Sequence, residues 1–115
     1  MFQKLRTVIY HSRDLQAAKE WYTRITGIAP YFDEPCYVGF DINGFELGID
    51  PDMTQVNEGN HSVAYWAVEG IEEVVKKMTT AGALLIQDVT NVGGPTHVAI
   101  VKDPFGNHVG LIEGA

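Results

Sequence analysis

The sequence predicts an α+β fold in which one pattern, a strand followed by a helix and three more strands, occurs twice. Two observations indicate this fold. Only two helical patterns interrupt a series of alternating, β-branched runs, and motifs of the first half return in the same order in the second half. A chain of 115 residues is long enough for one domain with a single core. We expect a first module at residues 1–55 and a second at residues 56–115.

A strand and a helix open the first module. Residues 5–11 alternate and are rich in β-branched side chains, which is typical of a strand. Asp14 is a suitable N-cap for a helix over residues 14–26, where apolar residues recur three or four positions apart. Gly27 comes next, and glycine readily adopts the left-handed conformation that commonly ends a helix.

Three strands complete the first module. The first is expected near residues 30–32, before a turn at Glu34-Pro35. The other two, at residues 36–42 and 45–50, flank Asn43-Gly44, a pair typical of a two-residue type I′ hairpin because both of its residues need positive φ. A turn of known length fixes the register of the two strands.

This register gives the hairpin one apolar and one polar face. The apolar face, which we expect to pack on the helix, holds Val38, Phe40, Ile42, Phe45, Leu47 and Ile49. The opposite face holds Tyr37, Gly39, Asp41, Glu46, Gly48 and Asp50. Aromatic, acidic and glycine residues together do not suit a closed core, so we expect this second face at solvent or in a cleft. By the same alternation Cys36 falls on the helix-facing side, as a buried and unreactive thiol.

The second half repeats this order after a polar connector at residues 51–60. A strand at residues 62–68 precedes a helix that opens at Gly70, with acidic residues in its first turn, and ends before Gly82. Three further strands are expected at residues 83–92, 96–101 and 107–112.

The residues themselves support an internal repeat. Asp41–Ile49 aligns without a gap on Asp103–Leu111, and an aspartate and two glycines coincide. In the same way Thr7–Tyr10 aligns on Val63–Trp66. The last strand of each module therefore has a glycine at the equivalent position.

Composition excludes several classes of function. Fifteen acidic against eight basic residues give a net charge of -7, which opposes binding to nucleic-acid phosphates. Cys36 is the only cysteine, so no intrachain disulfide forms and a reducing cytoplasm is expected. We expect no membrane partner, because no apolar run approaches the roughly 20 residues of a membrane-spanning helix.

Three groups of residues, in this order, resemble one known family. They are Ser12-Arg13-Asp14-Leu15 with Trp21-Tyr22 and Gly27, then Val68-Glu69-Gly70-Ile71 with Ala81-Gly82, then Asp103-Pro104-Phe105-Gly106-Asn107. Together they resemble the glyoxalase/bleomycin-resistance/extradiol-dioxygenase group, the vicinal oxygen chelate superfamily, over nearly the whole chain. The resemblance implies two paired βαβββ modules whose curved mixed sheets surround a cleft. It also suggests a homodimer, with modules paired within one chain or across chains.

The resemblance further implies a divalent metal at four cleft positions in the enzymes of the family. Those positions fall here on Thr7, Val63, Gly48 and Gly110, which offer neither the imidazole nor the carboxylate that such metals need. The usual metal site is therefore expected to be absent, and no cofactor is expected. This departure favours a likeness to the drug-sequestering members, which bind a small aromatic or cationic molecule without a metal.

The expected cleft is lined by residues of both modules, with the two glycines leaving open volume at its floor. Its ligand-binding set is Thr7, Ile9, Tyr37, Asp41, Glu46, Gly48, Val63, Tyr65, His97, Val101, His108, Gly110 and Ile112. Tyrosines and acids suit a planar or cationic ligand through stacking and charge pairing. Alternatively, neighbouring side chains or a second subunit fill the space.

A different class of function is an enzyme of glyoxalase or dioxygenase type. Strand parity places Glu46 and His108 on the cleft face, and we expect His97 to join them. Two imidazoles and a carboxylate form an acceptable ligand set for one relocated divalent metal. Glu46 and His108 are also the candidates for a metal-free acid–base couple.

Overall fold

The computed structural model of the protein describes residues 1–54, 56 and 62–114, and it confirms the repeated α+β pattern. The chain divides into two compact units, Met1–Glu58 and Gly59–Ala115. The first contains β1 (Thr7–His11), α1 (Leu15–Thr26), β2 (Phe32–Glu34), β3 (Tyr37–Ile42) and β4 (Phe45–Asp50). The second contains β5 (Tyr65–Ala67), α2 (Ile71–Thr80), β6 (Leu84–Gly93), β7 (Thr96–Lys102) and β8 (His108–Glu113).

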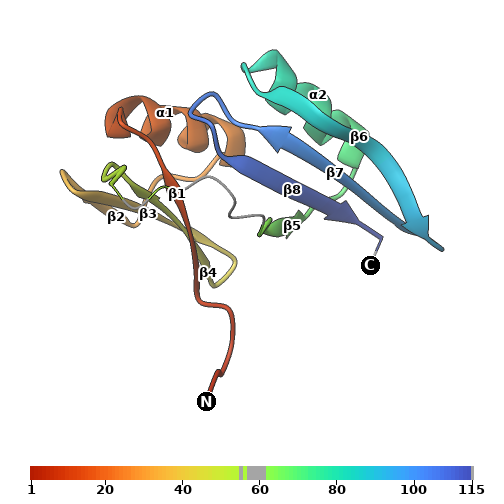
Figure 1. Ribbon diagram of the computed structural model, residues 1–115, viewed down its shortest axis with the longest axis horizontal. Coiled ribbons are helices and arrows are strands. Elements are labelled where there is room, and N and C mark those ends of the chain that lie inside the picture. The colour runs from red at the N-terminus through yellow and green to blue at the C-terminus, as the bar shows by residue number, and fades with distance from the viewer. Residues whose placement is uncertain (55, 57–61, 115) are drawn as a thin grey trace. The chain divides into compact units, whose positions relative to one another are not determined.

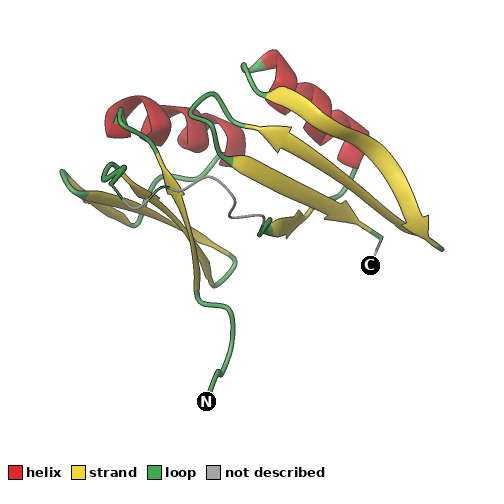
Figure 2. Cartoon of the chain, in the orientation of Figure 1, coloured by secondary structure: helices red, strands yellow, loops and turns green. Residues whose placement is uncertain are grey.

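The two units have the same sheet topology. Strand order is β1-β4-β3-β2 in the first sheet and β5-β8-β7-β6 in the second, and one helix lies beside each sheet (Figures 1 and 2). The first strand of each unit pairs in parallel with its last strand, while the other pairs are antiparallel. Both sheets are therefore mixed, as expected of two βαβββ modules.

Helix α1 begins and ends where the sequence predicts. The Asp14 carboxylate accepts a hydrogen bond from the Ala17 N–H at 3.0 Å, and Gly27 has φ 72°. Trp21 and Tyr22 of this helix are buried against the first sheet, where Phe40 is fully buried. The predicted apolar face of the hairpin thus forms the core of the first module together with α1.

The Asn43-Gly44 turn has the predicted conformation and register. Asn43 has φ 50° and Gly44 has φ 92°, as a type I′ hairpin requires. The pairs of β3 and β4 are Val38 with Ile49, Phe40 with Leu47 and Ile42 with Phe45 on one face, and Gly39 with Gly48 and Asp41 with Glu46 on the other. Because α1 covers the first of these faces, the second is the open face of the first sheet.

The turn between β7 and β8 is built around a buried carboxylate. Asp103 is 3% exposed, and its two oxygens accept hydrogen bonds from the backbone N–H groups of Phe105 and Asn107 and from the Asn107 amide, at 2.8–2.9 Å. Five residues, 103–107, separate the two strands. The motif that supports the family resemblance therefore fixes the last hairpin.

Helix α2 packs on one face of the second sheet and is capped from the end of β8. On this face Ala99 and Val101 of β7 and Leu111 of β8 are buried. The Glu113 carboxylate accepts hydrogen bonds from the N–H of Gly70 and, at 3.3 Å, from the N–H of Ile71. A negative charge at the first turn of a helix stabilises its exposed N–H groups.

The structure corrects some local expectations. Cys36 is exposed, because β3 begins one residue later and Cys36 lies in the turn before it. Strand β5 is shorter than the expected 62–68, so Val63 lies outside it. Of the connector expected at residues 51–60, residues 55 and 57–60 lie outside the described residues. Neither helix of the described chain has both the length and the apolar content needed to cross a bilayer.

Candidate functional site

A carboxylate held by three hydroxyl groups lies on the open face of the first sheet. Glu46 Oε1 accepts hydrogen bonds from the Thr7 hydroxyl at 2.6 Å and from the Tyr37 hydroxyl at 2.7 Å, and Oε2 accepts one from the Tyr31 hydroxyl. These four residues, here termed the Glu46 cluster, come from β1, β3, β4 and the segment before β2. The sheet thus brings together residues up to 39 positions apart in the sequence.

Two glycines make room for this cluster. A Cβ atom at Gly48 would lie 1.7 Å from the Tyr37 hydroxyl oxygen, and a Cβ at Gly39 would lie 2.8 Å from Glu46 Oε2 and 3.2 Å from the Tyr31 ring. Non-bonded heavy atoms do not approach as closely as 1.7 Å. Glycine at position 48 is therefore a condition for Tyr37 to reach Glu46, whereas a side chain at position 39 would displace the Glu46 carboxylate and the Tyr31 ring from their present positions.

The expectation of open volume above these glycines is corrected by the same contacts. The Tyr37 hydroxyl fills the space over Gly48. In the second module, the Tyr65 ring and the Ala64 carbonyl oxygen lie against Gly110, each 2.7 Å from the position of an added Cβ. Neighbouring groups thus fill both places, which is the alternative that the sequence left open.

The hydrogen bonds of the cluster determine its charge. Partial burial raises the pKa of Glu46, but the bonds from the three hydroxyls and the positive charge of Arg6 outweigh burial and hold that pKa below its ordinary value. Burial, followed by the bond to Glu46, raises the pKa of Tyr37 to about 12. The bond to Glu46 also raises the pKa of Tyr31. Near neutral pH the cluster is therefore an ionised carboxylate held by two protonated phenols.

One acceptor position of Glu46 remains. A carboxylate has about four lone-pair directions. Within the described chain, Oε1 accepts two hydrogen bonds and Oε2 accepts one. A further donor can therefore reach Oε2 without displacing any hydroxyl group of the cluster.

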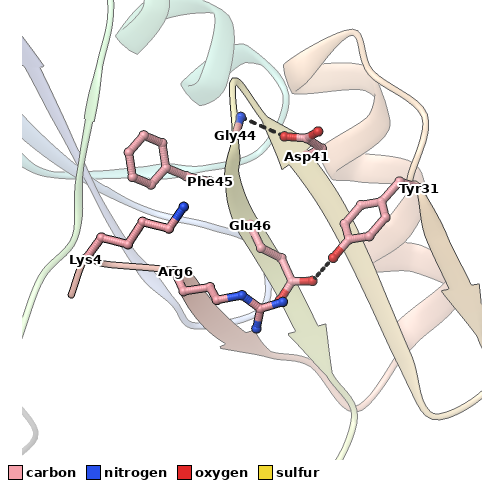
Figure 3. Close-up of a pocket in the computed structure, with 7 residues that line it drawn as sticks. All are labelled: Lys4, Arg6, Tyr31, Asp41, Gly44, Phe45 and Glu46. Atoms are coloured by element: carbon pink, nitrogen blue, oxygen red, sulfur yellow. Dashed lines mark hydrogen bonds between the residues drawn. The ribbon is translucent and has the colours of Figure 1, made fainter. Parts of the chain in front are cut away.

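A pocket of about 240 Å³ adjoins Oε2 at the end of the sheet where β1 begins and the hairpin turns. It is lined by Lys4, Arg6, Tyr31, Asp41, Gly44, Phe45 and Glu46 (Figure 3). Figure 3 shows the Glu46 carboxylate between Arg6 and Tyr31, and the Lys4 ammonium on the same side as the Phe45 ring. The pocket lies within the first module and combines two cations, two carboxylates and two aromatic rings.

Sequence reasoning placed Glu46, Thr7, Tyr37 and Asp41 on this face but missed the other residues of the pocket. Tyr31 precedes β2, and its N–H donates to the Gly39 carbonyl at 3.0 Å, which continues the strand pairing by one residue. The absent side chain at Gly39, next to an acid on an open face, is the signal that could have located Tyr31. Ile9 lies on the same face beside Gly48 and is 45% exposed.

The open face of the second sheet holds other predicted residues. Gly110 pairs with Tyr65 of β5, and Ile112 pairs with Ala67. His108 is exposed and lies opposite Lys102 of β7. The structure places Tyr65, His108, Gly110 and Ile112 on this one face, while Val63 is half-buried just before β5.

The predicted positions of His97 and Val101 are wrong. They pair with Glu113 and Val109, so both lie on the face that α2 covers, opposite to the face of His108. Val101 is fully buried, and His97 lies beside the first turn of α2. His97 and His108 therefore cannot share a metal ion within this sheet, and the described residues contain no group of three or more His, Cys, Asp or Glu side chains suited to a metal.

Comparison with protein families agrees with this architecture. Residues 4–111 match the family model described as Glyoxalase/Bleomycin resistance protein/Dioxygenase superfamily. The chain belongs to this superfamily. A search of curated proteins found no significant match.

Solved structures of other proteins share the fold. A glyoxalase/bleomycin resistance protein/dioxygenase family enzyme from Burkholderia phytofirmans PsJN superposes with a TM-score of 0.81 at 18% identity, over 96% of this chain and 98% of that one. Lactoylglutathione lyase from Agrobacterium tumefaciens gives 0.76 at 15% identity, over 96% and 93%. TioX from Micromonospora sp. ML1 gives 0.74 at 18% identity, over 98% and 100%. At these identities the likeness concerns the fold and not the activity.

Proposed function

We propose that this member of the superfamily binds a small organic molecule at the Glu46 cluster, without the help of a metal. The observation behind the proposal is an ionised carboxylate on an open sheet face, held in place by three hydroxyl groups and with one acceptor position left beside a pocket. A fixed, partly buried carboxylate of this kind suits a ligand that donates an N–H, above all an organic cation.

The charge states of the cluster favour binding over acid–base catalysis. An effective general acid or base has a pKa near the working pH. Hydrogen bonds hold the pKa of Glu46 below its ordinary value, and burial raises the pKa of Tyr37 to about 12, so neither group exchanges protons readily near neutrality. The cluster therefore resembles a recognition site more than a proton-transfer site.

The four positions that correspond to the metal ligands of the family lack suitable side chains, which supports ligand binding without a metal. The Thr7 hydroxyl is engaged with Glu46, and the Tyr37 hydroxyl occupies the space over Gly48. Val63 and Gly110 have no side-chain donor. Divalent metals of this kind need imidazole, thiolate or carboxylate ligands, which these positions do not offer.

Ligand binding can be tested by a thermal-shift and calorimetry screen of small organic cations. We expect binding to the natural protein and at least a tenfold loss of affinity in Glu46→Gln, since this variant keeps the shape of the side chain and removes its charge. Glu20→Gln, on the exposed side of α1, is the matched control and should bind as the natural protein does. Equal affinity in both variants, or no binding at millimolar ligand, would overturn the proposal.

Metal independence can be tested by elemental analysis of protein purified without chelators. We expect no stoichiometric metal and no gain in thermal stability when nickel, zinc, iron or manganese is added. Stoichiometric metal that is lost in His108→Ala would contradict this part of the proposal.

A further inference from the structure

The pocket beside Glu46 has opposite charges on its two sides. Lys4 and Arg6 belong to the segment that leads into β1, whereas Asp41 and Glu46 belong to the hairpin. Neither cation forms an ion pair with a described residue at 4.0 Å or less. Neither positive charge is therefore neutralised by a direct ion pair, although that of Arg6 acts on Glu46 from a greater distance.

The two acidic residues of the pocket lie on one face of the hairpin. Asp41 and Glu46 are cross-strand partners on one face of the hairpin, an arrangement in which like charges destabilise a sheet. Asp41 Oδ1 accepts the Gly44 N–H at 2.8 Å, which leaves its second oxygen, and Glu46 Oε2 has a remaining acceptor position. A cationic group at Glu46 Oε2 would fill this acceptor position and reduce the repulsion between the two acids.

We propose that the ligand of this pocket is a small zwitterion, with an ammonium group that donates to Glu46 and an acidic group that pairs with Lys4 and Arg6. This inference rests on the proposed function and specifies its ligand class. The exposed ring of Tyr31, which lies beside Glu46, would contact the apolar part of the molecule.

The charges around the pocket disfavour ligands with one charge only. A simple cation would be attracted to Glu46 but repelled by Arg6, whose charge already acts on that carboxylate. A simple anion would be attracted to Arg6 but repelled by Asp41 and Glu46. Only a ligand with both charges gains on both sides, and this difference is the basis of specificity.

The volume of the pocket indicates which ligands it can enclose. Pockets that enclose drug-sized molecules typically measure about 300–1,000 Å³. The pocket here measures about 240 Å³ and is open to solvent. A molecule of amino-acid size fits within this volume, and a larger ligand would extend into solvent.

A matched series of three ligands separates the charge requirements. Free phenylalanine, phenethylamine and hydrocinnamate share one aromatic ring and chain length, and differ in whether they bear both charges, the positive one or the negative one. By NMR titration of the full chain, we expect phenylalanine to bind about fivefold tighter than either singly charged compound, the effect of one partly exposed charge pair. Added salt should reduce the difference.

Variants assign each charge of the ligand to its partner. The double variant Lys4→Gln/Arg6→Gln should abolish the advantage of phenylalanine over phenethylamine, and Glu46→Gln should abolish its advantage over hydrocinnamate. Lys76→Gln/Lys77→Gln removes two charges from α2 in the other module and should change neither ratio. Since Lys4 and Arg6 are exposed, their replacement leaves the core intact, and circular dichroism would verify the fold.

The outcomes distinguish this inference from the proposed function. Phenethylamine binding as tightly as phenylalanine, with loss in Glu46→Gln, would overturn the zwitterion and support the cation site. Hydrocinnamate binding best, unaffected by Glu46→Gln, would overturn both. Absence of binding by all three compounds would overturn the zwitterion inference, while the broader cation screen decides the proposed function.

Discussion

Gly48 in the first module and Gly110 in the second occupy equivalent positions. The neighbouring group that leaves no room for a side chain differs between the two. Gly48 leaves space for the hydroxyl group of Tyr37, a side chain that reaches across the open face of the sheet. Gly110 lies against the backbone oxygen of Ala64 and also donates its N–H to that oxygen at 2.9 Å. The same residue thus serves a polar site in one module and strand pairing in the other.

The residues two positions before these glycines, Glu46 and His108, also have different surroundings in the two modules. Glu46 is half-buried and accepts three hydrogen bonds, whereas His108 is exposed opposite Lys102. Both modules keep the same strand order, so the repeat preserves the backbone. The polar cluster, in contrast, depends on two tyrosines that only the first module supplies.

The largest expected effect concerns the aspartates that align in the repeat. Asp103→Ala removes at least three hydrogen bonds from a buried turn and should destabilise the protein by about 3 kcal/mol or more. Asp41→Ala removes one bond at an exposed turn, and about 1 kcal/mol or less is expected. Urea unfolding of both variants measures the difference, and equal losses would contradict the buried role of Asp103.

A second comparison uses the glycines. Gly110→Ala places a methyl group against backbone that cannot move without breaking the pairing of β5 and β8, so we expect a loss of about 2–3 kcal/mol. Gly48→Ala displaces one phenol instead, and about 1 kcal/mol is expected. A larger loss of stability in Gly48→Ala than in Gly110→Ala, measured by chemical denaturation, would contradict a movable neighbour at Gly48 and a fixed one at Gly110.

A third test concerns the pH dependence of the Glu46 cluster. The folded pKa of Tyr37 is about 12 against an ordinary 10.0, so its contribution to stability is complete below pH 10.0 and is lost as the pH rises towards 12. Glu46 has a lowered pKa, so its contribution is present above the ordinary carboxyl pKa and is lost as the pH falls through the folded value.

Tyr37→Phe should weaken both pH-dependent contributions, because Glu46 loses one hydrogen-bond donor. Unfolding free energies across the acid and alkaline ranges, with the ultraviolet absorbance of tyrosinate, report the two transitions. A variant with the same acid and alkaline profiles as the natural protein would show that Tyr37 and Glu46 are not coupled.

Much of the fold follows from local signals in the sequence. Gly27 and Asn43-Gly44 have a positive φ, which few other residues adopt, and the Asp14 side chain caps α1, so these residues fix α1 and the β3–β4 register. Because that register was known, the face of Glu46, Tyr37 and Asp41 could be predicted as well.

The errors arose where no two-residue turn set the register. A connection of five residues joins β7 to β8, and one residue more or fewer would move His97 and Val101 to the opposite face. Lys102 was an available signal, because a charged residue at the end of the strand favours the open face. Its neighbour Val101 then points to the buried face. The hydrogen bonds of Tyr31 depend on side-chain reach across the sheet, which periodicity does not describe.

The contact between Glu113 and the start of α2 has a consequence for the order of folding. Its partners, Gly70 and Glu113, are 43 residues apart, so the helix receives its carboxylate cap only after β8 has joined β5 and β7. Contacts of such long separation slow folding, because a large loop must close before they form. A nascent chain that has reached residue 80 therefore contains all of α2 but not the group that stabilises its first turn.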